Sequence, residues 1–158
     1  MEQELDMFIH HEVGESQPNI LEGENLKRII KTFPDSVLEF FARAVKDILA
    51  DTHSKGLLSY IIRHRRKSSL GFYAGFLDGM RKMLCPEVVA ACREFWEDND
   101  WSKVDKARLA CRANHELYAA KLQEIGERLT TEPAELVENW AEKELLAPLG
   151  LGRPSAGQ

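Results

Sequence analysis

A cysteine and a histidine four positions apart are the residues whose types and spacing come closest to a chemical site. Cys111 and His115 would share one face of a helix, where a thiolate and an imidazole can bind the same metal ion. Cys85 and Cys92, or the histidines at 10–11, could add ligands only if the fold brings them close. No C-x-x-C or H-E-x-x-H motif occurs, and both residues fall on the apolar stripe of their helix, as core residues do. We therefore expect no metal site and no cofactor.

The most basic stretch, Arg63-His64-Arg65-Arg66-Lys67, holds four bases in five residues. It has three interpretations: binding of an anion or nucleic acid, pairing with the acids of a partner, or a solvated basic corner. Ser68 completes an R-R-x-S pattern, at which phosphorylation would place a charge near the start of the next helix. No aromatic residue is interleaved with these bases, which weakens the case for stacking on single-stranded nucleic acid.

The whole chain is acidic, with 21 Lys and Arg against 26 Asp and Glu and a net charge of −5. Outside residues 63–67 the balance is 17 bases against 26 acids, a net charge of −9. This distribution argues against a general nucleic-acid binder, which spreads its bases over a face. It leaves open an acidic inhibitor or immunity-type protein that covers a basic partner.

The length of 158 residues and an apolar content of 44% suit one globular domain. No apolar run reaches the roughly 18 residues of a membrane span, and the acidic N-terminal segment does not resemble an export signal. Three cysteines form no disulfide framework, so we expect reduced thiols and a cytoplasmic location. No nucleophile elbow, P-loop or dinucleotide-binding pattern occurs, so we predict that the protein is not an enzyme.

Apolar residues recur at helical spacing almost throughout, and no segment alternates as a strand would. We predict an all-α fold, a single compact bundle of about seven or eight helices over residues 1–147, with a disordered tail over 148–158. Capping boxes predict helix starts at Ser36, with Glu39, and at Ser102, with Asp105.

The most apolar stretch, Ser68 to Leu84, is predicted to be a buried central helix around which the others pack. Gly71, Gly75 and Gly79 are spaced four apart and would share one face of it. Without side chains they would let another backbone approach closely, within the bundle or at a contact with a partner or a second copy. Close packing within the bundle is favoured, because the surrounding residues are so apolar.

This arrangement resembles the Bcl family of apoptosis regulators, including its viral members. The stretch Glu4–Ile9 resembles the family's opening E-L-x-x-x-F-I/L pattern, and Ile30–Asp35 stands where the family has L-x-x-x-G-D. The signature D-G-x-N-W-G-R would fall at Arg66–Phe72, where Gly71 matches, and the family's membrane tail is absent. The resemblance implies a bundle whose groove takes an amphipathic death-motif helix, and hence inhibition of apoptosis.

The leading hypothesis is a non-enzymatic interaction protein that binds a partner's amphipathic helix in an apolar groove. Arginines of the basic stretch would pair with an acid of that helix, in place of the family arginine that is missing at Phe72. A homodimer is left open. The predicted partner-binding residues are Phe40, Phe41, Val45, Ile48, Leu58, Ile61, Ile62, Arg63, Arg65, Arg66, Gly71 and Phe72.

Overall fold

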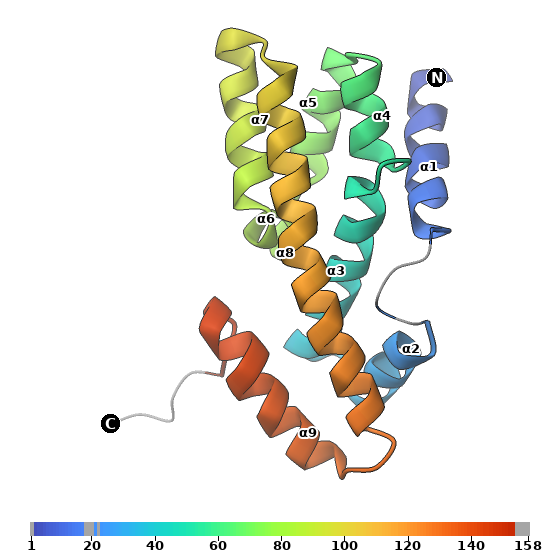
Figure 1. Cartoon of the computed structure of the whole chain (residues 1–158), viewed down its shortest axis with the longest axis vertical. Helices are drawn as coiled ribbons and strands as arrows, with labels where there is room; N and C mark the ends of the chain where they lie inside the picture. The colour runs from blue at the N-terminus through green and yellow to red at the C-terminus, as the bar shows by residue number, and fades with distance from the viewer. Residues whose placement is uncertain (1, 18–20, 22, 154–158) are drawn as a thin grey trace. The chain divides into compact units, whose positions relative to one another are not determined.

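The structure is a computed structural model that describes the backbone of residues 2–17, 21 and 23–153, and the side chains of these residues from Phe8 onward. Every regular element in that part of the chain is a helix, which confirms the all-α class (Figure 1). The α-helices are α1 (Glu2–Glu15), α2 (Gly23–Thr32), α3 (Val37–Thr52), α4 (Leu57–Arg63), α5 (Lys67–Phe76), α6 (Gly79–Leu84), α7 (Pro86–Asp98), α8 (Trp101–Arg128) and α9 (Ala134–Ala141). A π-helical turn, η1 (Glu142–Leu146), and a 3-10 turn, η2 (Ala147–Leu149), follow α9.

Residue contacts divide the chain into two compact units. Unit 1 consists of Met1–Asn19 and Ala44–Glu116, and unit 2 consists of Ile20–Arg43 and Leu117–Gln158. Each unit has its own buried apolar side chains, so each is described by itself. The single domain over residues 1–147 stays a prediction.

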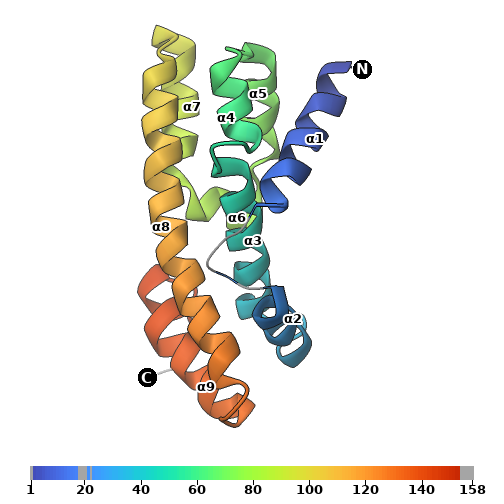
Figure 2. The ribbon, with the colours of Figure 1, turned by 45° about the vertical axis from the view of Figure 1, so that its right-hand side comes forward.

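Unit 1 is built from helices that bury one apolar face each. Helix α1 packs on α4 and α5, α4 packs on α5, and α7 packs on α5 and α6 (Figures 1 and 2). The burial follows the helical spacing of apolar residues in α3, α4 and α8. The side chains at 0% exposure in this core include Val45, Ile48, Leu58, Ile61, Leu70, Val88, Val104 and Cys111.

Two arginines of α8 satisfy carbonyl groups at the end of α3. The Nη1 atom of Arg108 donates to the Thr52 carbonyl oxygen at 2.8 Å, and that of Arg112 donates to the Leu49 carbonyl oxygen at 3.0 Å. The last carbonyls of a helix have no partner within the helix, so side-chain donors there remove an unpaired buried acceptor. These bonds hold the last turn of α3, which carries Asp51.

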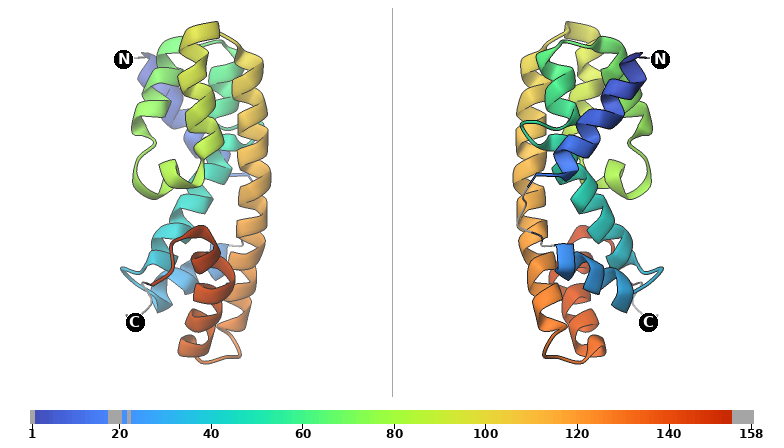
Figure 3. Two further views of the ribbon diagram at one scale, coloured as in Figure 1. Left: turned by 90° about the vertical axis from the view of Figure 1, so that its left-hand side faces the viewer. Right: turned by 90° about the vertical axis from the view of Figure 1, so that its right-hand side faces the viewer.

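The helix predicted over Ser68–Leu84 is wrong, because the chain leaves the helical conformation between α5 and α6 (Figure 3). Leu77 and Asp78 are extended, and Gly79 has a φ of +45°, a left-handed conformation that glycine adopts at little cost. Phe72 and Phe76 are also exposed, at 53% and 67%. The stretch is therefore a bent wall of unit 1 and not a buried central helix.

The glycines of this stretch do not form a close-packed face, contrary to the prediction. A Cβ atom at Gly71 would lie 3.3 Å from the ring of Trp96, while one at Gly75 would meet nothing within 4 Å. Gly79 is the first residue of α6 after the break, and it adopts the left-handed backbone conformation there. The regular spacing therefore does not reflect one shared packing role.

Unit 2 has a smaller core, in which α2 lies against the second part of α8. The Nη1 atom of Arg28 donates to the Gly126 carbonyl oxygen at 2.8 Å. A Cβ atom at Gly126 would lie 2.4 Å from Asn25 Cβ, so a hydrogen is all that fits there. The side chains at 0% exposure in this core include Ile29, Phe41, Leu122, Ile125 and Val137.

The first predicted capping box is present in modified form. The Ser36 hydroxyl accepts the Glu39 backbone N–H at 3.1 Å, as expected, but the Glu39 carboxylate accepts the N–H of Asp35 at 2.6 Å. At the second site the predicted cap is wrong. The carboxylate of Asp100 accepts the N–H of Ser102 at 2.9 Å, so Asp100 caps α8, which starts at Trp101.

Helical structure extends to Leu149, beyond the predicted end of the bundle at residue 147. Beyond η2, the Leu151 N–H donates to the Leu146 carbonyl oxygen at 3.0 Å, and Arg153 pairs with Glu138. Residues 154–158 of the predicted tail, like Pro18 in the first loop and the side chain of Leu5, lie outside the described residues. No helix in the described part of the chain is long and apolar enough to cross a membrane.

Two glycine-to-alanine substitutions test the packing of the helices in opposite directions. Gly126→Ala should destabilise the protein by about 1–2 kcal/mol, because the new methyl group collides with Asn25. Gly75→Ala should stabilise it by up to about 1 kcal/mol, because alanine favours the helix and nothing opposes the added Cβ. Denaturation followed by circular dichroism measures both, and equal stability of the two variants would contradict the described packing.

Candidate functional site

An apolar groove of about 450 Å³ lies in unit 1. Three phenylalanines line this groove and are largely exposed to solvent: Phe8 at 73%, Phe72 at 53% and Phe76 at 67%. Leu57 and Leu77 are the buried apolar residues of its lining. The volume lies in the range of about 300–1,000 Å³ typical of pockets that bind ligands. Exposed aromatic rings around such a groove make it the candidate binding surface of unit 1.

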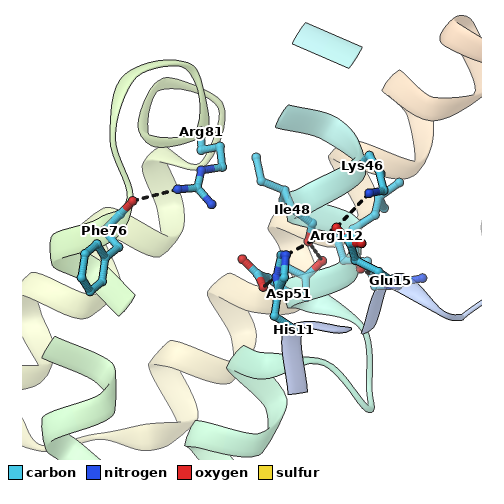
Figure 4. Close-up of polar contacts among 10 residues, drawn as sticks. His11, Glu15, Lys46, Ile48, Asp51, Phe76, Arg81 and Arg112 are labelled. Carbon is cyan, nitrogen blue, oxygen red and sulfur yellow. Dashed lines mark hydrogen bonds and ion pairs between the residues drawn. The ribbon is translucent and has the colours of Figure 1, made fainter. Parts of the chain in front are cut away.

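Helix α1 brings a histidine to the polar side of the groove. His11 Nδ1 donates to Asp51 Oδ1 at 2.8 Å, and its Nε2 lies 3.4 Å from Glu15 Oε1 (Figure 4). The hydrogen bond to Asp51 raises the pKa of His11 above 6.5 against the opposing effect of burial, and the negative charges of Asp51 and Glu15 add to the rise. Lys46 Nζ in turn donates to Glu15 Oε1 at 2.8 Å.

An arginine stands across the groove from this histidine. Arg81, on α6, donates from Nη2 to the Phe76 carbonyl oxygen at 3.0 Å and lies 3.6 Å from Asp78 Oδ1 (Figure 4). The carbonyl group of Phe76 is free to accept because α5 ends at that residue. A guanidinium group has five N–H donors, so Arg81 keeps donors for an anionic group in the groove.

A buried tyrosine forms part of the groove wall. Tyr73 is 4% exposed, and its hydroxyl oxygen has no hydrogen-bond partner among the described residues. Burial raises the pKa of Tyr73 well above 10, so the group stays a neutral phenol. An unpaired buried hydroxyl group costs roughly 1–3 kcal/mol, which a nearby polar group or ligand could recover.

Five of the apolar side chains predicted to wall a groove lie in the cores instead. Phe41, Val45, Ile48, Leu58 and Ile61 are each 0% exposed, so they offer no open surface. A stripe of apolar residues predicts which face of a helix is buried, and here the fold itself covers that face.

The other predicted residues have accessible surface. Phe40 is 51% exposed but belongs to unit 2, Ile62 is half-buried, and Gly71 packs by the ring of Trp96. Phe72 is the predicted residue that lines the observed groove.

The basic stretch 63–67 connects α4 to α5, and several of its bases contact the protein itself. Arg63 Nη2 donates to the Ser54 carbonyl oxygen at 3.0 Å, the guanidinium group of Arg66 lies 5.0 Å from the ring centre of Tyr60, and Lys67 donates to the side chain of Asn99. Arg65 is exposed and has a φ of +49°. These contacts decide among none of the three interpretations, which stay predictions.

A separate polar cluster lies inside unit 1. Cys85 Sγ and Cys111 Sγ are 2.8 Å apart, and Cys111 Sγ lies 3.6 Å from His115 Nδ1. All three residues are 0% exposed. The hydrogen bond with Cys85, together with burial, raises the pKa of the Cys111 thiol, which His115 partly opposes. Cys92 is also buried, and burial raises its pKa to about 11.

Sequence reasoning missed most residues of the observed groove. Phe8 and His11 are spaced one helical turn apart, as are Phe72 and Phe76, so their shared faces could have been found. The position of Arg81 at the groove could not be predicted from the sequence, because it depends on the break in the helix before α6. The approach of Cys85 to Cys111 on α8 likewise depends on tertiary packing, of which the local sequence gives no sign.

The described part of the chain is all-α, and the apolar groove of unit 1 is its candidate site. The chain matches the C-terminal domain of a family of unknown function (DUF6866) over residues 1–144, and it belongs to that family. Neither the curated proteins nor the solved structures include a match to the chain. The site itself must therefore carry the argument for function.

The contact between His11 and Asp51 predicts a pH dependence of stability. Because the folded state raises the pKa of His11 above the unfolded value of 6.5, the stabilisation is complete below pH 6.5 and is lost as the pH rises through the folded pKa. NMR titration of the imidazole protons should give a lower pKa for His11 in Asp51→Asn. The fall in stability across the same pH range should shrink in that variant, and an unchanged pKa would contradict the hydrogen bond.

Proposed function

We propose that the protein is a non-enzymatic interaction protein that receives an amphipathic helix of a partner in the groove of unit 1. The observation that carries this proposal is the exposure of Phe8, Phe72 and Phe76 around an apolar groove of about 450 Å³. Apolar side chains one turn apart on the ligand would fill the groove and remove these rings from water.

The polar side of the groove supports a ligand with an acidic residue beside its apolar stripe. Arg81 is fixed by the Phe76 carbonyl group and has further donors, so a carboxylate on the ligand can pair with it. In this proposal Arg81 takes the role that the sequence assigned to Arg63, Arg65 or Arg66.

The resemblance to the Bcl family supports a narrower form of the proposal. The ligand would then be a death-motif helix of a pro-death protein, and the chain would inhibit apoptosis in the cytoplasm by sequestering it. Anion or nucleic-acid binding through residues 63–67 has less support, because Arg63, Arg66 and Lys67 make contacts within the protein.

The direct test is fluorescence anisotropy of labelled death-motif peptides titrated with the protein at physiological salt. Phe72→Ala and Phe76→Ala should each weaken binding about tenfold or more, because each removes an aromatic anchor of the groove. Arg81→Gln should weaken binding of the acidic peptide and have little effect on a peptide whose acid is replaced by an amide.

Phe40→Ala is the matched control, because Phe40 is a similarly exposed phenylalanine outside the groove. It should bind as the wild type does, whereas a loss in Phe40→Ala alone would favour the groove predicted from sequence. No saturable binding of any peptide by a folded wild-type protein would reject the proposal. Self-association that Phe72→Ala abolishes would instead assign the groove to a second copy of the chain.

A further inference from the structure

The cluster of Cys85, Cys111 and His115 is not explained by the groove or by the packing of apolar residues. One ligand atom from each of the three residues lies within 4.8 Å of the others. The residues come from two places in the fold: Cys85 precedes the first turn of α7, and the other two lie one turn apart on α8. Three groups able to bind metal thus converge at full burial.

The chemistry of the set favours a soft or borderline metal ion. Two thiolates and one imidazole form the donor set of many zinc sites, in which three protein ligands leave a fourth position for water or another group. Carboxylate and carbonyl oxygens, which magnesium and calcium prefer, are not part of the cluster. We propose that Cys85, Cys111 and His115 bind a zinc ion in the interior of unit 1.

The distances require only a small rearrangement. With Zn–S near 2.3 Å and Zn–N near 2.0 Å, a tetrahedral ion separates sulfur from nitrogen by about 3.6 Å and two sulfurs by about 3.8 Å. The separation of Cys111 Sγ from His115 Nδ1 is already 3.6 Å. The two sulfur atoms, at 2.8 Å, must move apart by about 1 Å, which rotation of the side chains can supply.

The imidazole ring lies beside the two sulfur atoms, and its Nδ1 atom also lies 2.7 Å from the Cys111 carbonyl oxygen. A neutral ring that carries its proton on Nε2 has its lone pair on Nδ1, the nitrogen nearest Cys111 Sγ in the distances above. Binding of the ion would exchange the contact of Nδ1 with the carbonyl oxygen for a bond to the metal.

The full burial of the cluster is compatible with metal binding that accompanies folding. A zinc ion can be bound as its ligands come together during folding, so it needs no open path to the finished core. A disulfide between Cys85 and Cys111 would likewise have to form before folding is complete, because both thiols are 0% exposed in the folded protein. Purification with reductant therefore separates the two outcomes in the test below.

The test compares metal content and cobalt spectra of the full chain, purified with reductant and without chelator from zinc-supplemented cells. Wild type should contain about one zinc ion per chain, and its cobalt form should show thiolate-to-metal charge-transfer bands. Cys85→Ser, Cys111→Ser and His115→Asn should each lose most of the metal. Cys92→Ser is the matched control, since it removes a buried cysteine outside the cluster, and should keep both signals.

The wild-type protein alone also decides the question if a variant fails to fold. Removal of metal by a chelator should lower its melting temperature, and zinc should restore it. Absence of zinc together with absence of charge-transfer bands on cobalt addition would overturn the proposal, as would a Cys85–Cys111 disulfide found under reducing purification. Cobalt bound without thiolate bands would point to the half-buried group His11, Glu15 and Asp47 and would equally reject the cysteine site.

Discussion

The candidate site depends on how closely α1 can approach the end of α3. A Cβ atom at Gly14 would lie 2.2 Å from the Ala50 carbonyl oxygen, so any larger residue would push α1 away. His11 lies one turn before Gly14 and therefore meets Asp51, the neighbour of Ala50. One turn earlier still, Phe8 reaches the groove. A single close backbone approach thus places both the polar and the apolar residues that α1 contributes.

Most helices of this fold could be predicted because their signals are local. Apolar residues at helical spacing mark the buried faces, Pro86 begins α7, and Ser36 caps the start of α3 through its hydroxyl group. The break after α5 could not be predicted from the same signals. The apolar residues of 68–84 keep a helical spacing across it, and a glycine such as Gly79 fits a packed helix face as well as a left-handed turn.

The site was harder to predict than the fold, for a physical reason. Hydrophobicity identifies residues that avoid water, but whether they do so in the core or against a partner depends on the covering elements. Phe41 and Phe40 are adjacent in sequence, yet the first is fully buried and the second is half-exposed. The same limit applies to Cys85, whose approach to Cys111 follows from the turn between α6 and α7 and leaves no mark in local sequence.

Tyr73 connects the two features of unit 1 that are proposed to bind ligands. Its side chain lines the groove, and burial raises its pKa, to which the negative charges of Asp51, Cys85 and Cys111 would add. Binding of the proposed zinc ion would change the charge on Cys85 and Cys111, and would therefore change the electrostatic environment of a residue that lines the groove.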